Sequence, residues 1–419
     1  MTDLHYLIDK FGNPDALIDH WDISSNRYAI WGFEETFSIN SNGVAQLNGE
    51  YSDSPPLELW QKTIDNWKLK SNELSAVGFI SYDFKNILYP HISFNKPNSN
   101  QPLLWFGKPK NVIPYSIAKT KPFTNSPLFQ MEKDIPPPHE YEKAIHIIKA
   151  YLANGDSYQI NFTQPKQYRL DADPFKIYSS MRESVHPHYG MYLNLEDFQI
   201  LSFSPERFFC TSGENIESFP MKGTRPRSQN IILDERLADE LYQSEKDRAE
   251  HLMIVDLIRN DMGKICNYGS INVDGLYDIH SYETVHQMVS KVSGKLHKSV
   301  NEVDIFKALF PGGSITGAPK EKSMEIIDLL EDYQRGVYTG SVGCIQPNGD
   351  MDFNIAIRTM TVQNEKGIYP IGGGIVWDSD SLEEWQEAQQ KGAILKSFCH
   401  EIQPHSIYNK NENLIPTHQ

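Results

Sequence analysis

Three neighbouring stretches of the chain decide its fold class: VYTGSVGCI at 337–345, NIAIRTMTV at 354–362 and IYPIGGGIVW at 368–377. Each is rich in β-branched and aromatic residues and is flanked by turn-forming residues, so each predicts a β-strand. Periodic apolar residues predict helices over 141–152, 234–260, 321–331 and 382–398. Strand patterns are also found at 76–83, where a turn follows, and at 158–163. Because strands and helices do not follow a regular βαβ order, the sequence predicts a large mixed α+β protein.

The composition is that of an ordinary globular protein. The 419 residues are 39% hydrophobic and 22% charged, which argues against a disordered chain. The formal net charge of −16 argues against non-specific binding to nucleic acid. No apolar stretch is long enough for a membrane span, and the first residues lack a signal-peptide pattern. The four cysteines are widely and irregularly spaced, which argues against a zinc ribbon or a disulfide framework and favours a cytoplasmic location.

A run of three prolines, Pro136–Pro138, marks the clearest boundary in the chain. We expect an N-terminal region over 1–135, a larger domain over 136–402 and a polar tail over 403–419. The N-terminal region is expected to pack onto the larger domain or to share sheets with it. The sequence alone does not decide between a separate domain and strands donated to a common sheet.

Two predicted helices each carry a pair of carboxylates three residues apart. Asp247 and Glu250 lie on one helix, and Glu384 and Glu387 on the other, with Lys391 four residues beyond Glu387. Residues at this spacing project from the same helix face. Two such faces turned toward each other would suit Mg²⁺, which prefers carboxylate oxygens. Spacing alone favours the simpler alternative of two solvated helix faces.

Two glycine-rich segments could approach a ligand closely. Gly372, Gly373 and Gly374 lie in the last predicted strand, where bare N–H groups can hold a carboxylate or phosphate. A bulge or a tight bend is the alternative. The turn over 311–320, which contains Ser314, opens a helix whose N-terminus favours anions. It lacks the Walker spacing, so it does not indicate a nucleotide.

Three further side chains are candidates for chemistry. Lys222 lies in a compact basic turn and would be a nucleophile if its amine were neutral, although most lysines are surface residues. Glu206 is a candidate general acid or a paired charge at the end of a strand. His286 could tune a site, but a histidine satisfied within the core is the favoured interpretation.

The order of these motifs along the chain is more specific than any one of them. The segments from about 139 to 400 resemble the chorismate-utilising enzymes, which include anthranilate synthase component I, aminodeoxychorismate synthase component I, isochorismate synthase and salicylate synthase. The resemblance implies a large α/β sandwich of the anthranilate synthase component I type, with antiparallel-rich sheets flanked by helices. The motifs that carry it are SPE at 204–206, PMKGT at 220–224, DRAEH at 247–251, DLIRND at 256–261, GAPK at 317–320, RGVY at 335–338, IR at 357–358, GGG at 372–374 and EWQEAQQK at 384–391.

The resemblance also implies roles for individual residues. Glu250 and Glu387 match the Mg²⁺-binding glutamates, with Asp247 and Glu384 at second positions of those motifs. Glu206 matches the general acid that helps the C4 hydroxyl of chorismate to leave. Lys391 is expected to face a substrate carboxylate. The other positions that the resemblance assigns to substrate binding are Gly223, Thr224, His286, Ser314, Tyr338, Arg358, Gly372, Gly373 and Gly374.

Two positions distinguish the members of this family. Members that add water carry a lysine where this chain has Gln159, so the resemblance argues against water as the nucleophile. Anthranilate synthases carry alanine where this chain has Lys222, and lysine there is typical of aminodeoxychorismate synthase component I. The resemblance therefore implies conversion of chorismate and ammonia to 4-amino-4-deoxychorismate, for para-aminobenzoate and folate synthesis. An anthranilate-forming enzyme and an inactive chorismate-binding regulatory subunit are the alternatives.

The resemblance further implies a partner. The chain has no Gly-x-Cys-x-Gly motif of a glutaminase, so ammonia is expected from a separate glutamine amidotransferase subunit or from free ammonium. Some relatives hold tryptophan between N-terminal strands, usually marked by a Leu-Leu-Glu-Ser stretch. That stretch is absent here, which argues against tryptophan feedback and leaves structural binding of tryptophan in the N-terminal region open.

Overall fold

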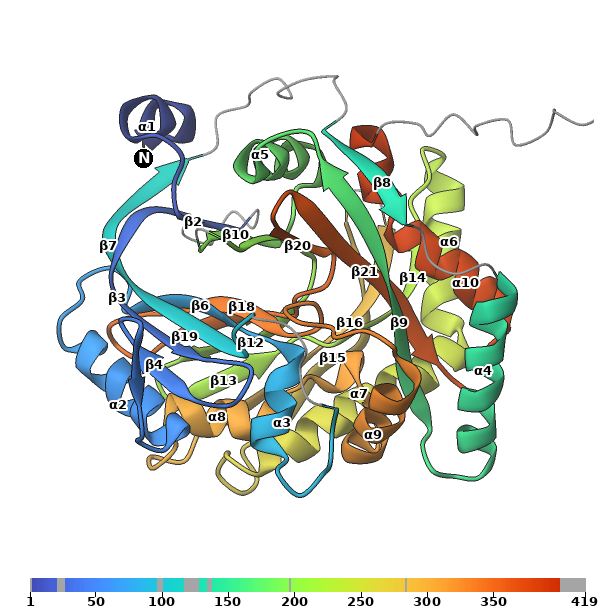
Figure 1. Ribbon diagram of the computed structural model, residues 1–419. Helices are drawn as coiled ribbons and strands as arrows, with labels where there is room; N and C mark the ends of the chain where they lie inside the picture. The colour runs from blue at the N-terminus through green and yellow to red at the C-terminus, as the bar shows by residue number, and fades with distance from the viewer. Residues whose placement is uncertain are drawn as a thin grey trace, which may run out of the picture.

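The computed structural model describes residues 2–20, 27–95, 101–116, 128–133, 138–195, 197–282 and 285–399 (Figure 1). The predicted tail over 403–419 and two of the boundary prolines, Pro136 and Pro137, lie outside these ranges. Elements in the N-terminal part are β1 (Thr2–Asp3), α1 (Leu4–Phe11), β2 (Ala16–Asp19), β3 (Tyr28–Ile39), β4 (Ala45–Leu47), β5 (Glu50–Ser52), α2 (Pro56–Lys68), β6 (Ala76–Ile80), η1 (Tyr82–Phe84), α3 (Lys85–Leu88), β7 (Leu104–Ser116) and β8 (Phe129–Lys133).

The larger C-terminal part begins with α4. Its elements are α4 (Pro138–Ala153), β9 (Gln159–Leu170), α5 (Pro174–Val185), β10 (Tyr189–Asn194), β11 (Gln199–Ser204), β12 (Arg207–Ser212), β13 (Asn215–Ser218), β14 (Met221–Pro226), α6 (Ile231–Gln243), α7 (Glu245–Gly263), β15 (Asn272–Ser281), β16 (Val285–Lys295), α8 (Glu302–Leu309), η2 (Gly313–Ile315), β17 (Gly317–Ala318), α9 (Lys320–Leu330), β18 (Ser341–Ile345), β19 (Met351–Asn354), β20 (Thr359–Gln363), β21 (Lys366–Ile375), α10 (Ser381–Lys391) and η3 (Ala393–Phe398).

The strands form one connected, strongly bent β-structure with helices packed around it. Among the described strands, β1 and β7 pair in parallel, and the other pairings between named strands are antiparallel. The long strands β9 and β21 cross the molecule side by side, in register from Ile160 opposite Ile375 to Arg169 opposite Lys366 (Figure 1). The predicted mixed α+β class with antiparallel-rich sheets is confirmed.

Strands of the N-terminal part are hydrogen-bonded to strands of the C-terminal part. β6 pairs with β18, with Gly78 opposite Gly343, and β2 pairs with β10, with Leu17 opposite Tyr192. The buried cores also combine both parts of the chain, because Trp60 from α2 packs against Phe306 from α8. The two parts therefore share sheets and core, whereas the exact boundary at residue 135 stays a prediction.

The helix predicted over 234–260 is in fact two helices, and that prediction was wrong. Ser244 adopts an extended conformation between α6 and α7, and its Oγ accepts a hydrogen bond from the backbone N–H of Asp247. A serine hydroxyl that caps a helix satisfies a free N–H group, which it cannot do inside a continuous helix. The interruption gives α7 its own N-terminus just before its carboxylates.

Three other predicted elements were too long. The strand predicted over 337–345 starts at Ser341, because Thr339 has a positive φ of 57°. The strand predicted over 354–362 starts at Thr359, because Arg358 has a φ of 49°. The final helix ends at Lys391 and continues as a short 3₁₀ helix to Phe398. Positive φ values lie outside the extended region and end a strand.

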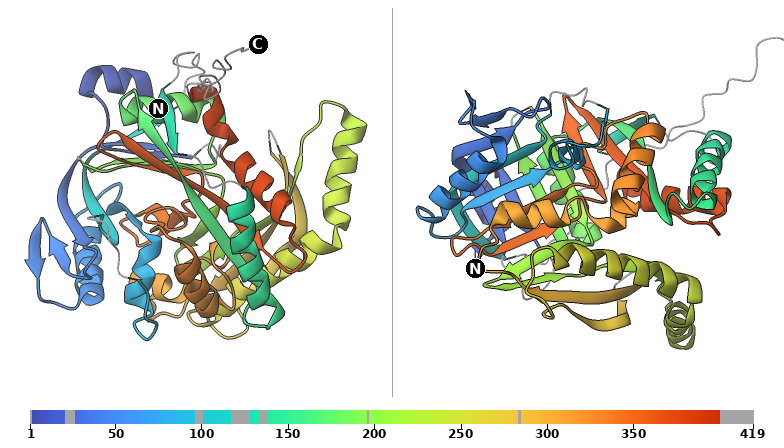
Figure 2. Two further views of the ribbon diagram at one scale, coloured as in Figure 1. Left: turned by 45° about the vertical axis from the view of Figure 1, so that its right-hand side comes forward. Right: turned by 90° about the horizontal axis from the view of Figure 1, so that it is seen from below.

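Helices cover the strands that carry the candidate residues. α10 packs on β21 and on α4, and α7 packs on β14 and β16 (Figure 2). These contacts bring α7 and α10 to the part of the sheet where β9, β14 and β21 meet. None of the helices in the described part of the chain is long and apolar enough to span a bilayer.

Candidate active site

Lys222 lies on β14 with its amine in the interior of the site. Its Nζ donates a hydrogen bond to Oε1 of Gln159 on β9 at 3.1 Å and lies 3.9 Å from Oε2 of Glu250 on α7. Burial lowers the pKa of the Lys222 amine, with Glu250 opposing the shift and Lys391 adding to it. Burial thus moves the amine in the direction of its neutral, nucleophilic form.

Glu206 occupies the turn between β11 and β12, and only 8% of it is exposed. One carboxyl oxygen accepts a hydrogen bond from Ser314 Oγ at 3.1 Å. Burial raises the pKa of Glu206 to about 7, although the Ser314 hydrogen bond and the charge of Lys222 act in the opposite direction. A carboxyl group with such a pKa holds its proton near neutrality and can give it up, as a general acid must.

The predicted carboxylates come from α7 and α10 and act on one another. Burial raises the pKa of Glu250, and the negative charge of Glu387 adds to this shift. Burial also raises the pKa of Glu384, whose Oε1 accepts a hydrogen bond from Ser379 at 2.6 Å. Lys391, 2.8 Å away, lowers the pKa of Glu387. Asp247 is held by Arg225 at 3.0 Å. The two helix faces therefore lie within each other's electrostatic reach, with Glu250 mostly buried and Glu387 58% exposed.

The glycines keep backbone close to these side chains. A Cβ atom on Gly374 would lie 3.0 Å from Lys222 Nζ and 2.9 Å from Gln159 Cδ. One on Gly373 would lie 3.3 Å from Lys391 Nζ and 3.5 Å from Glu384 Oε2. The Gly372 carbonyl accepts a hydrogen bond from Lys391 at 2.8 Å. The triple glycine thus lines the space between Lys222 and the α10 residues.

Not all predicted residues lie equally close to this centre. Thr224 is exposed on β14. The ring of His286 is buried and bonded on both sides, to Ser281 Oγ at 2.8 Å and Asp234 Oδ1 at 3.0 Å. Tyr338 is buried beside the turn that precedes β18. Arg358 is half-buried near Tyr369 on β21, where its charge opposes the burial-driven rise of the tyrosine pKa.

Comparisons with known proteins identify the family of the chain. The sequence profile of the chorismate binding enzyme family matches residues 19–397. The chain belongs to the chorismate-binding enzyme family. It is 33% identical over 416 residues to aminodeoxychorismate synthase component 1 of Bacillus subtilis, covering 88% of each chain. It is 36% identical over 407 residues to anthranilate synthase component 1 of Saccharolobus solfataricus, covering 93% of this chain and 92% of the other.

A solved structure supports the fold of this chorismate-binding enzyme. Anthranilate synthase component I from Streptococcus pneumoniae superposes with a TM-score of 0.77 at 26% identity, covering 89% of this chain and 93% of the other. The predicted family and fold type are therefore confirmed, and the chain is a chorismate-utilising enzyme. The roles of its individual residues stay predictions.

The chorismate-binding enzyme has neighbours at its site that the sequence interpretation missed. Tyr282 lies close enough to Glu206 for that carboxylate to add to the rise in the tyrosine pKa, which burial dominates. His251 on α7 is buried, its Nε2 lies 2.6 Å from Ser290 Oγ, and burial lowers its pKa to about 4. His251 ends the DRAEH motif and could have been found from its position, whereas Tyr282 has no signal in the sequence.

The carboxylates fit a divalent cation by their chemistry. Glu250, Glu384 and Glu387 are hard oxygen donors on facing helices, and the repulsion between Glu250 and Glu387 is what a cation would relieve. Within the described ranges, no three His, Cys, Asp or Glu side chains are already grouped to hold a metal ion. Lys222 and Lys391 lie beside these carboxylates and partly balance their charge.

Proposed function

We propose that this enzyme converts chorismate and ammonia to 4-amino-4-deoxychorismate. The observation that carries the proposal is the place of Lys222, whose partly buried amine contacts Gln159, lies near Glu250 and acts electrostatically on Glu206. A lysine in this position offers a nucleophile other than water or ammonia. The similarity to aminodeoxychorismate synthase component 1 of Bacillus subtilis supports the same activity.

The lysine first forms a covalent bond to the substrate. The neutral amine of Lys222 attacks C2 of chorismate, the two ring double bonds shift, and the C4 hydroxyl leaves with the proton of Glu206. Ammonia then attacks C4 and gives its surplus proton to the Glu206 carboxylate, the double bonds shift back, and the C2–Nζ bond breaks to release the neutral lysine amine. The enolpyruvyl group is retained throughout. Splitting one displacement into two steps in this way is the usual gain from a covalent nucleophile.

The substrate is a dianion, and the site offers cations for it. Arg358 and Lys391 would hold carboxylate groups, and the backbone of Gly372–Gly374 permits close approach. Mg²⁺ held by Glu250 and Glu387, with Asp247 and Glu384 nearby, would neutralise a substrate carboxylate and draw electron density from the ring.

Ammonia would come from a glutamine amidotransferase partner in the cytoplasm, or from free ammonium. The component 1 designation of the Bacillus subtilis relative is consistent with a second subunit. The product would serve para-aminobenzoate and folate synthesis. Anthranilate formation is the competing candidate, because the similarity to the Saccharolobus solfataricus anthranilate synthase component 1 extends over 93% of this chain.

Product analysis tests the proposal directly. The purified chain is incubated with chorismate, Mg²⁺ and ammonium, and the products are identified by mass spectrometry. We expect aminodeoxychorismate from the wild-type enzyme and loss of most of it from Lys222→Ala. Lys291→Ala is the matched control, because Lys291 lies on the neighbouring strand β16 and pairs with Glu217, away from the site.

A denatured sample from a reaction without ammonium provides a second readout. The covalent route predicts that Lys222 then carries one chorismate less one water. Anthranilate with released pyruvate from the wild-type enzyme would contradict the proposed product. Unchanged product and rate in Lys222→Ala would remove the covalent step.

A further inference from the structure

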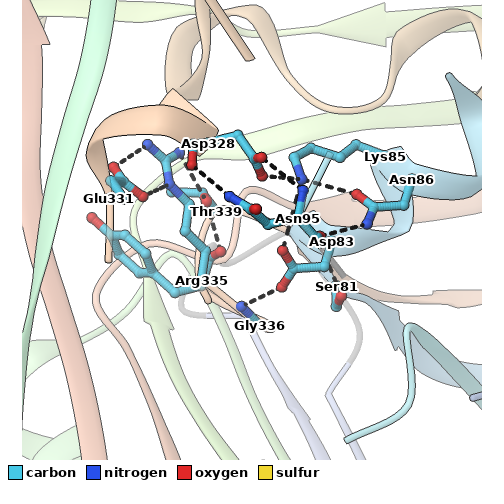
Figure 3. A network of polar contacts seen from close by, with 11 residues as sticks. Ser81, Asp83, Lys85, Asn86, Asn95, Asp328, Glu331, Arg335, Gly336 and Thr339 are labelled. Atoms are coloured by element: carbon cyan, nitrogen blue, oxygen red, sulfur yellow. Dashed lines mark hydrogen bonds and ion pairs between the residues drawn. The ribbon is translucent and has the colours of Figure 1, made fainter. Parts of the chain in front are cut away.

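Arg335 lies at the centre of a buried polar network behind the active site. Only 3% of it is exposed, and its guanidinium forms two hydrogen bonds with Glu331, at 2.8 and 2.7 Å (Figure 3). The guanidinium also lies over the ring of Tyr82, 4.5 Å from its centroid. A planar guanidinium held on both oxygens of one carboxylate has little freedom to turn. Its remaining donors are therefore aimed in fixed directions.

Those donors bind two separate elements that line the site, η2 and β9, which we call its two walls. Nη1 donates to the carbonyl of Ile315 in η2 at 2.9 Å, and Nη2 donates to the carbonyl of Asn161 on β9 at 2.6 Å. The side chain of Asn161 donates to the same Ile315 carbonyl at 3.0 Å. Glu331 in turn accepts hydrogen bonds from the backbone and hydroxyl of Thr163, both at 2.8 Å. Arg335 and Glu331 thus tie η2 to β9.

Each wall carries a residue that holds one of the reacting groups. Ser314, next to Ile315, donates the hydrogen bond to Glu206. Gln159, two positions before Asn161 on the same strand, accepts the hydrogen bond from Lys222. A shift of either wall would change the distance between the acid and the nucleophile, and catalysis is sensitive to displacements of that size.

We propose that Arg335 is a positioning residue, which fixes Ser314 and Gln159 and through them sets the relative positions of the Glu206 carboxyl and the Lys222 amine. This inference rests on the proposed function for the roles of Glu206 and Lys222. Arg335 itself touches neither the reacting groups nor, in the proposed mechanism, the substrate.

The network contains its own control. On its other side, Lys85 pairs with Asp328 at 3.3 Å, and Asp328 accepts a hydrogen bond from the backbone of Asn95 at 2.8 Å (Figure 3). These bonds join the N-terminal part to α9 and do not reach η2 or β9. Asp328→Asn should therefore weaken the same network without moving either wall.

The test compares kcat and its pH profile in Arg335→Lys and Asp328→Asn. Lysine keeps the positive charge but cannot donate hydrogen bonds to Glu331, Ile315 and Asn161 at the same time with the guanidinium geometry. We therefore expect kcat to fall about 10- to 100-fold with a smaller change in KM. Loss of the Ser314 hydrogen bond should also shift the alkaline limb, where kcat falls with rising pH, to higher pH. The reason is that this hydrogen bond lowers the pKa of Glu206. The other groups that face Glu206 are Lys222 on β14 and Tyr282 after β15, with Arg207 and Asp261 lining the small cavity beside it, and none of them is replaced in these variants. A displaced Lys222 would add to the shift in the same direction, because its charge also lowers the pKa of Glu206.

A double-mutant cycle with Ser314→Ala separates positioning from general damage. Ser314→Ala should shift the alkaline limb to higher pH, and adding Arg335→Lys should then shift it by less than Arg335→Lys does alone, because only the contribution of a displaced Lys222 remains. Glu331→Gln is the milder variant if Arg335→Lys does not fold, with the same direction of effect. In Asp328→Asn, the alkaline limb of the pH profile should lie at the same pH as in the wild type.

The outcomes for the two proposals are distinct. A folded Arg335→Lys enzyme with wild-type kcat and an unshifted limb overturns the positioning role, even if the wild type makes aminodeoxychorismate. An equal shift in Asp328→Asn would also overturn it. If the wild type makes another product, the proposed function fails. The pH profile can then still be measured from the rate of chorismate consumption, so the role of Arg335 is tested independently.

Discussion

At Glu206, burial and charge act on the pKa of the carboxyl in opposite directions. Its carboxyl is buried and has a single hydrogen-bonding side chain, Ser314, among the described residues. With a folded-state pKa of about 7 against an ordinary 4.5, the folded enzyme binds a proton that the unfolded chain releases. Stability should therefore decrease as the pH rises through this interval, and the acid form needed for catalysis is lost over the same range.

Replacing Glu206 by glutamine should separate these two effects. Glu206→Gln should lower kcat by about 10²- to 10⁴-fold and remove the alkaline limb near pH 7. It should also raise the free energy of unfolding at pH 8 by up to about 3 kcal/mol, and by almost nothing at pH 4. Activity profiles and urea denaturation at the two pH values measure both. A variant equally stable or less stable than wild type at pH 8 would contradict the raised pKa.

At this scale the sequence was informative about types of residue and not about their contacts. Lys222, Glu206, Glu250 and Glu387 could be named because they lie in motifs with a distinctive order along the chain. The hydrogen bond from Lys222 to Gln159 joins residues far apart in sequence, as do the bonds of Arg335 to η2 and β9. Local patterns carry no information on such pairs.

Among the elements, β14 shows how a local irregularity aims a side chain. Lys222 lies opposite Met288 and Thr224 opposite Gln287, so Gly223 between them is an extra residue in the strand. Its φ is +68°, and a Cβ there would lie 2.8 Å from Leu241 Cδ1 and 3.0 Å from Asp247 Oδ1. A bulge of this kind needs glycine and redirects the neighbouring side chains.

We expect Gly223→Ala to destabilise the protein by about 2–3 kcal/mol, from backbone strain and crowding together, and to reduce turnover. Gly213→Ala is the matched control, because its φ is +58° but no atom lies within 4 Å of the added Cβ. That variant should lose only about 1 kcal/mol, from strain, and keep its activity. Urea denaturation and chorismate turnover give the two quantities. Equal losses in both variants would show that crowding near Lys222 does not matter.

Element types were predicted well and their ends less well. The strands at β18 and β20 start late because Thr339 and Arg358 adopt positive φ values, which no propensity for those residues indicates. The division between α6 and α7 depends on a single capping hydroxyl, Ser244. A serine is a typical N-cap residue, so the sequence does contain a signal for a helix start at Ser244. The apolar pattern continues across Ser244, however, and by itself predicts one helix.

In the molecule as a whole, the N-terminal part completes the sheet of the catalytic part. The sequence could not decide this, because β6 and β18 are each ordinary strands whose partners are distant in the chain. Trp60 and Trp67 on α2 are fully buried in a core that includes residues of α8 and β19. Neither part has a complete core of its own.

The chain should therefore unfold in one transition. Tryptophan fluorescence includes the signals of Trp60 and Trp67 and so reports on the N-terminal part. It should give the same urea midpoint as far-ultraviolet circular dichroism, which reports on the whole chain. A fragment starting at residue 136 should be unfolded or aggregated. Two separate midpoints, or a folded and monomeric fragment, would show that the two parts are independent.

The pairing of β6 with β18 also has a consequence during translation. β6 is the apolar segment AVGFI, and it pairs with β7 on one edge and with β18 on the other. The second edge stays unpaired until β18 has been synthesised. Roughly 260 residues separate the two strands, so at about 5–20 residues per second the ribosome needs about 15–50 s to supply the missing edge. Through that interval the nascent chain presents an open, apolar strand edge, which makes it a substrate for chaperones and a risk for aggregation in the cell.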